Sequence, residues 1–110
     1  MNLAIFHSPG FTNYGFMHTK LEHLTSKLNK ILVLCRRRDR LSQRWAGEKM
    51  SPMKLFWQDR KESWEEVVEL ILGQTNTLLV FWGKGDKDKE LGELVRMAEE
   101  QNKKVRELYG

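Results

Sequence analysis

The segment Thr77–Ala98 constrains the fold of this chain more than any other. It places an apolar run, TLLVFW, directly before a glycine-containing loop, GKGDKDK, and then an amphipathic stretch, ELGELVRMA. An uninterrupted apolar run is typical of a strand that is buried on both faces of a parallel sheet. A glycine loop that leads into a helix is how α/β proteins build phosphate and nucleotide sites. The segment therefore predicts an α/β fold with a binding site at this loop.

The length and cysteine content of the chain restrict the class of protein to which it can belong. Its 110 residues predict one domain that spans residues 1–110. No apolar run approaches the roughly 20 residues that cross a bilayer, and the N-terminal segment does not have the pattern of a signal peptide. Cys35 is the only cysteine, so no intrachain disulfide can form. We therefore expect a cytoplasmic protein without membrane contact.

Positive charge is concentrated in the first half of the chain. Residues 1–52 carry nine Lys/Arg against three Asp/Glu, whereas residues 53–110 carry ten against twelve, and the net charge is +4. The excess is densest at Arg36–Arg40, which has the sequence RRRDR. Such a cluster attracts phosphate, nucleotides or nucleic acid, and the alternative is a solvated surface. Nucleic-acid binding through Arg36–Arg40 therefore stays open.

Five apolar runs alternate with four amphipathic stretches along the chain. Apolar residues recur at helical spacing within each stretch, and Ser63 with Glu66 fits a capping box. The predicted strands are Asn2–His7, Ile31–Cys35, Met53–Trp57, Leu78–Trp82 and Val105–Leu108. The predicted helices are Phe16–Leu28, a helix capped by Asp39 that ends near Lys49, a helix capped by Asp59 or Ser63 that ends at Gly73, and Lys89–Asn102.

This alternation predicts a mostly parallel five-stranded sheet with helices on both faces, because parallel strands need crossover connections. Since crossovers are right-handed, few strand orders remain, and we expect the order 3-2-1-4-5. Ligands of such doubly wound sheets bind at the carboxyl ends of the strands, beside the point where the order reverses. This order would bring Ser8–Gly15, Arg36–Arg38 and Gly83–Asp88 to one rim of the sheet.

The candidate ligand-binding residues come from these three loops. Glycine lets the backbone approach a phosphate, and arginine or lysine supplies positive charge. Serine and asparagine offer hydrogen bonds, and a tyrosine ring can stack on a base. The alternative is that these are ordinary turns whose aromatic residues close the core. The candidates are Ser8, Gly10, Asn13, Tyr14, Arg36, Arg37, Arg38, Gly83, Lys84, Gly85 and Lys87.

Catalytic residues are only weakly indicated. Glu90 and Glu93 lie early in the last predicted helix, where acidic residues also serve to balance the helix dipole. The three histidines do not have the spacing of a metal site, so neither a metal nor a cofactor is expected. His7 is the only histidine at the end of a predicted strand. Trp57 and Trp82 also end strands, and their exposure would favour a protein partner.

Two segments resemble a known superfamily. LLVFWGKGDKDKELGELVRMAEEQNKKV, residues 78–105, resembles the closing half of Rossmann-like domains of the SLOG superfamily, and DRLSQRWA, residues 39–46, resembles a helix of its YspA-like branch. Relatives in that superfamily include the LOG phosphoribohydrolases and DprA. The resemblance implies a Rossmann-like domain that binds a nucleotide or a nucleotide-derived ligand, and some members cleave N-glycosidic bonds. The Pro-Gly-Gly-x-Gly-Thr-x-x-Glu motif of the LOG enzymes is absent here, which favours binding over catalysis.

Three functions stay open at this point. The first is a non-catalytic sensor, sponge or adaptor that binds a nucleotide-derived ligand. The second is a hydrolase or transferase that cleaves N-glycosidic bonds, with Glu90 or Glu93 as nucleophile or base. The third is a protein-binding module that acts on a host factor, of the kind that phages and mobile elements encode. The exposed edges expected at the third and fifth strands also make a homodimer an option.

Overall fold

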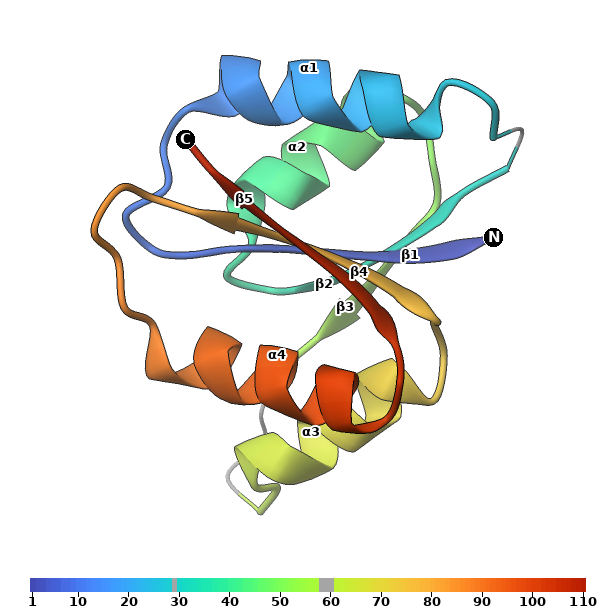
Figure 1. The fold of residues 1–110 in the computed structure, drawn as a ribbon. Helices are drawn as coiled ribbons and strands as arrows, with labels where there is room; N and C mark the ends of the chain where they lie inside the picture. The colour runs from blue at the N-terminus through green and yellow to red at the C-terminus, as the bar shows by residue number, and fades with distance from the viewer. Residues whose placement is uncertain (29, 58–60) are drawn as a thin grey trace.

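Strands and helices alternate along the whole chain (Figure 1). The computed structural model describes residues 1–28, 30–57 and 61–110. The strands are β1 (Asn2–His7), β2 (Leu32–Arg36), β3 (Met53–Phe56), β4 (Thr77–Trp82) and β5 (Lys104–Tyr109). The helices are α1 (Tyr14–Thr25), α2 (Arg40–Glu48), α3 (Trp64–Leu72) and α4 (Lys89–Glu100).

The strands form one sheet in the order β3-β2-β1-β4-β5, and every neighbouring pair is parallel. This confirms the predicted strand order. The centre of the sheet pairs β1 with β4, where Ala4 lies opposite Leu78 and His7 opposite Phe81. The order reverses between β1 and β4, which makes this a doubly wound, Rossmann-like α/β fold.

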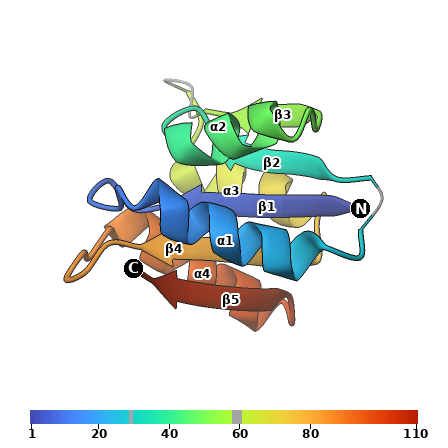
Figure 2. The ribbon, with the colours of Figure 1, turned by 90° about the horizontal axis from the view of Figure 1, so that it is seen from above.

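Two layers of helices cover the sheet, α1 and α2 on one face and α3 and α4 on the other (Figures 1 and 2). Successive strand residues point to opposite faces. In β1, Ala4 and Phe6 pack with the α3 and α4 side, whereas Leu3 and Ile5 pack with the α1 and α2 side. Both faces of the central strands are therefore buried, which explains why their sequences are continuous apolar runs rather than alternating ones.

Side-chain caps mark where α1 and α3 begin. Asn13 Oδ1 accepts a hydrogen bond from Phe16 N at 3.1 Å, so α1 begins at Tyr14, two residues before the predicted start. Ser63 caps α3 by accepting from Glu66 N at 3.2 Å, as predicted. The alternative cap, Asp59, lies outside the described residues.

The two edge strands differ in what they expose. On β3, Met53 and Leu55 are 42% and 37% exposed, and Trp57 just beyond it is 59% exposed. Trp82, at the end of β4, is instead buried, and its Nε1 donates to Glu107 Oε1 at 3.0 Å. Of the two tryptophans that end strands, Trp57 is therefore exposed and Trp82 is not, and at the other edge β5 exposes Tyr109.

Candidate functional site

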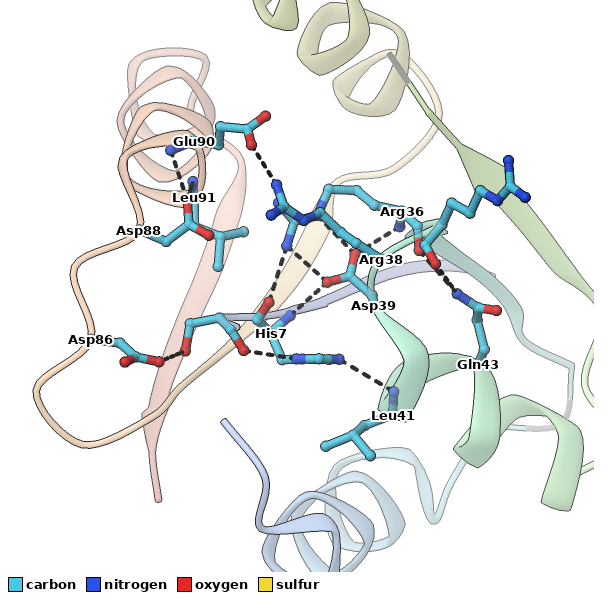
Figure 3. A network of polar contacts seen from close by, with 12 residues as sticks. His7, Arg36, Arg38, Asp39, Leu41, Gln43, Asp86, Asp88, Glu90 and Leu91 are labelled. Carbon is cyan, nitrogen blue, oxygen red and sulfur yellow. Dashed lines mark hydrogen bonds and ion pairs between the residues drawn. The ribbon is translucent and has the colours of Figure 1, made fainter. Parts of the chain in front are cut away.

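Arg36 and Asp39 form a buried ion pair at the carboxyl end of β2 (Figure 3). Their side chains are 4% and 0% exposed. Arg36 Nε and Nη2 donate to the Asp39 carboxylate at 2.9 and 2.8 Å. The main-chain N–H groups of His7 and Arg36 donate to the same carboxylate at 3.0 and 2.7 Å. Asp39 thus accepts four hydrogen bonds and joins the end of β1 to the end of β2.

Asp39 occupies the N-cap position of α2, but its side chain makes no capping hydrogen bond. The predicted N-cap position of Asp39 is therefore confirmed, but the side chain does not cap the helix. The carboxylate instead accepts from the Arg36 guanidinium, a charge-assisted interaction, and from the main-chain amides of His7 and Arg36. A different side chain ties the start of α2 to β2, since Gln43 Nε2 donates to the carbonyls of Arg36 and Arg37 at 3.2 and 2.9 Å.

Arg36 retains one donor group without a partner. Its Nη2 also donates to His7 O at 3.0 Å, but Nη1 is buried and has no hydrogen-bond partner within the described part of the chain. The guanidinium carbon lies 5.7 and 5.8 Å from the ring centres of Phe6 and Trp64. A buried donor left unpaired costs about 1–3 kcal/mol. Nη1 therefore marks a position where an external acceptor would be stabilising.

A pocket of about 270 Å³ lies beside Arg36, between the carboxyl ends of β2 and β3 and the beginnings of α3 and α4. We call it the arginine pocket. Guanidinium groups bind anions, and aromatic rings bind planar groups by stacking. It is lined by three arginines, three aromatic residues and one carboxylate, namely Arg36, Arg37, Arg38, Phe56, Trp57, Trp64 and Glu90.

Glu90 is held against this pocket by its main chain and by Arg38. Arg38 Nη1 donates to Glu90 Oε1 at 2.5 Å, and the two side chains are 52% and 36% exposed. Trp64 Nε1 donates to Glu90 O at 3.0 Å, and Asp88 Oδ1 accepts from Glu90 N at 2.9 Å. The second glutamate predicted as a catalytic candidate, Glu93, is not among the residues that line the pocket.

The loops after β1 and β4 close on each other through Asp86. Ser8 Oγ donates to Asp86 Oδ2 at 2.5 Å and accepts from Gly83 N at 2.8 Å. A Cβ on Gly10 or Gly83 would overlap the Asp86 carboxylate. The neighbouring hollow of about 180 Å³ is lined by the two loops alone and contains no arginine. Asp86 therefore occupies the position next to the glycines where we expected a ligand anion.

The structure divides the predicted ligand-binding residues into separate groups. It brings Arg36, Arg37 and Arg38 into the arginine pocket, but none of the other eight candidates lines that pocket. Gly85 has a φ of +80°, so it serves a tight turn that favours glycine. The eight outside are Ser8, Gly10, Asn13, Tyr14, Gly83, Lys84, Gly85 and Lys87.

Tyr14 is engaged with α2. Its hydroxyl donates to Glu48 Oε2 at 2.6 Å, and the Arg44 guanidinium carbon lies 4.0 Å from its ring centre. Burial and the hydrogen bond to Glu48 raise the pKa of the Tyr14 hydroxyl, while the same hydrogen bond lowers the pKa of Glu48. Tyr14 therefore links α1 to α2, and its ring is already covered by a guanidinium group.

His7 has both ring nitrogens in hydrogen bonds. Leu41 N donates to Nε2 at 3.2 Å, so Nδ1 carries the ring hydrogen and donates to Ser8 O at 2.9 Å. The ring is buried, which leaves no nitrogen available to a substrate. The only cysteine, Cys35, is also buried, and burial raises the pKa of its thiol to about 12.

Sequence reasoning missed the aromatic wall of the pocket. Trp64 fits the apolar stripe of α3, which is typical of a core residue, although its place in the first turn of a helix beside the strand ends was a usable signal. Among residues 1–28, 30–57 and 61–110, no cluster of three or more His, Cys, Asp or Glu side chains could hold a metal ion. The helices of this described part are also too short or too polar to cross a membrane.

Comparisons of the chain with models of known families, with curated proteins and with solved structures found no match. The resemblance to SLOG domains therefore stays a prediction that depends on residues 39–46 and 78–105. The structure itself defines a Rossmann-like α/β protein with an arginine-rich, aromatic-walled pocket at the carboxyl edge of its sheet.

Proposed function

We propose that this chain binds a nucleotide or a nucleotide-derived ligand in the arginine pocket, as a non-catalytic sensor, sponge or adaptor. The observation that carries the proposal is the buried Nη1 of Arg36, which has no partner within the described residues, on a residue that also lines a pocket with aromatic walls. An anionic group of the ligand would supply the acceptor that Nη1 needs. The aromatic residues would receive the base.

The position of the pocket agrees with this proposal. Doubly wound sheets bind ligands at the carboxyl ends of their strands, usually beside the point where the strand order reverses. In this chain that point lies between β1 and β4, where Asp86 fills the space between the loops. The arginine pocket lies at the same edge of the sheet, over the neighbouring strands β2 and β3.

The contributions of the arginines and of the aromatic residues to ligand binding can be tested separately. Arg37 lines the pocket without an ion pair to any described residue, and Trp57 is 59% exposed, so we expect the fold to tolerate truncation of either side chain. We expect Arg37→Ala to weaken nucleotide binding about tenfold or more, through loss of charge-assisted hydrogen bonds. We expect Trp57→Ala to weaken it by at least about fivefold, through loss of base stacking. Isothermal titration with nucleoside mono- and diphosphates and cyclic oligonucleotides measures both effects.

The matched control is Arg96→Ala, which removes the same charge from the exposed face of α4, where Arg96 pairs with Glu100. This variant should bind as the wild type does. The proposal fails if no nucleotide binds, or if all three variants bind alike. A single-stranded oligonucleotide in the same series tests the nucleic-acid alternative, because such binding would weaken steeply with salt.

Cleavage of an N-glycosidic bond is a second candidate, favoured by one observation: the carboxylate of Glu90 lines the same pocket. Incubation with nucleoside monophosphates and chromatography for free base tests it. Enzymatic release of base that is lost in Glu90→Gln would support this activity. Absence of release, or release that survives the substitution, would remove Glu90 from that role.

A further inference from the structure

The two arginines that extend from the end of β2 toward α4 are held very differently (Figure 3). Arg36 is buried, and Asp39 and the His7 carbonyl fix its guanidinium group. Arg38 is half-exposed and forms an ion pair with Glu90, its one such partner in residues 1–28, 30–57 and 61–110. Exposed ion pairs contribute little to stability, whereas buried charged groups are costly to separate. Arg38 can therefore change partner at small cost, and Arg36 cannot.

Glu90 is free to move only in its side chain. Its main-chain N–H and carbonyl are both used, by Asp88 and by the Trp64 indole. The carboxylate is bound to Arg38 and partly exposed to solvent, so rotation of the side chain can release it into water. Release of Glu90 would free the Arg38 guanidinium group in the same pocket that Arg36 lines.

The N-terminus of α4 is not an alternative anion site. The Asp88 carboxylate accepts from Glu90 N and Leu91 N, at 2.9 and 3.4 Å, and so occupies the amides that an anion would use. Asp88 and Glu90 also place negative charge there. Among the described residues that line the pocket, the arginines are therefore the charged donors that an anion would meet.

We infer that the Glu90 carboxylate competes with the ligand's anionic group for Arg38, and that the pocket selects a phosphate monoester over a singly charged phosphodiester. This inference rests on the function proposed above for the arginine pocket. The incoming phosphate accepts a hydrogen bond from Arg36 Nη1. It also replaces Glu90 as the partner of Arg38, and the Glu90 side chain turns toward solvent. A doubly charged phosphate attracts Arg38 more strongly than the single charge of Glu90 or of a cyclic diester does.

The test compares ligands that share a base and a ribose but differ in phosphate charge. Titrations at constant ionic strength use 5′-AMP, 3′,5′-cyclic AMP and inorganic pyrophosphate, which is an anion without a ring. We expect the wild type to prefer 5′-AMP over cyclic AMP, and Arg38→Ala to lose that preference. We expect Glu90→Gln to bind both 5′-AMP and pyrophosphate about threefold to fivefold tighter, which is the size of an exposed ion pair.

The matched control is Glu93→Gln, which removes the same charge from the next turn of α4, outside the pocket. Its affinities should match the wild type. If 5′-AMP binding depends on Arg37 and Trp57 but is unchanged in Glu90→Gln, this inference is overturned and the proposed function stands. A different outcome would contradict the proposed function instead. In it, Glu90→Gln tightens pyrophosphate binding, 5′-AMP binds no better than pyrophosphate, and Trp57→Ala leaves the affinity for 5′-AMP unchanged. Absence of binding by all three ligands overturns both.

Discussion

Replacing Asp39 by alanine is expected to destabilise the protein by about 3–5 kcal/mol. The substitution leaves the Arg36 guanidinium buried without its counter-charge, at a side chain that is only 4% exposed. It also removes the acceptor of two main-chain N–H groups, those of His7 and Arg36. Since domains of this size have about 5–15 kcal/mol of stability, the variant should be close to unfolding. Urea denaturation followed by tryptophan fluorescence measures the loss.

Two controls separate the buried ion pair from charge in general. Glu100→Ala breaks the exposed pair with Arg96 and should change stability by less than about 0.5 kcal/mol. The double variant Arg36→Met with Asp39→Asn removes both charges and keeps an oxygen for the main-chain donors. It should regain much of the stability lost in Asp39→Ala, because no unpaired buried charge remains. A loss below about 1 kcal/mol in Asp39→Ala would contradict the geometry described here.

The second large effect is expected at Gly83, where alanine should cost about 1–3 kcal/mol through overpacking. A Cβ there would lie 2.7 Å from the main-chain carbon and oxygen of Gly10 and 2.6 Å from Asp86 Oδ2. Side chains can rotate away from such a contact, but the main chain of Gly10 can move only if the whole loop moves. The hydrogen bond from Gly83 N to Ser8 Oγ would be disturbed at the same time.

Gly92→Ala makes the same chemical change within α4, where no described atom apart from the helix's own backbone and the chain neighbours lies within 4 Å of the added carbon. It should stabilise the protein by about 0.5–1 kcal/mol, since alanine is the better helix former. The two substitutions should thus have opposite signs in one thermal denaturation series. Asp86→Ala combined with Gly83→Ala should relieve only part of the strain, because the contact with Gly10 remains. A neutral Gly83→Ala would mean that the loops do not pack as described.

The strand order was predictable because it depends on patterns that are local in the sequence. Each apolar run is long enough to identify a strand, each amphipathic stretch a helix, and right-handed crossovers restrict the topology. The ends of α1 were less predictable, since the apolar spacing of its leucines does not show that Asn13 caps it. Helix boundaries follow from such single hydrogen bonds rather than from the overall pattern.

The burial of Arg36 could be predicted only in part from the sequence. Leu34 and Arg36 are two residues apart on β2, so the alternation of a strand places both on the same buried face. The two arginines that follow give the segment the composition of an exposed loop, which hides this signal. The partner, Asp39, lies only three residues away, but the position of an aspartate before a helix favoured a capping role.

The contact between Ser8 and Asp86 could not have been read from the sequence. The two residues are 78 positions apart, and no periodic pattern joins them. Both glycine loops therefore resembled open phosphate sites, and only their tertiary packing shows that Asp86 fills the space between them. The arginine pocket escaped prediction for the same reason, because its walls come from β2, β3, α3 and α4.

The arginine pocket shares a wall with the free edge of the sheet. Phe56 and Trp57 line the pocket, and they belong to or directly follow the edge strand β3. A second copy of the chain or another protein that paired with β3 would therefore also change the shape of the pocket. By thermodynamic linkage, a ligand that altered the affinity for such a partner would have its own affinity altered by the same factor. Occupancy of the pocket and assembly at the β3 edge would then be two readouts of one equilibrium.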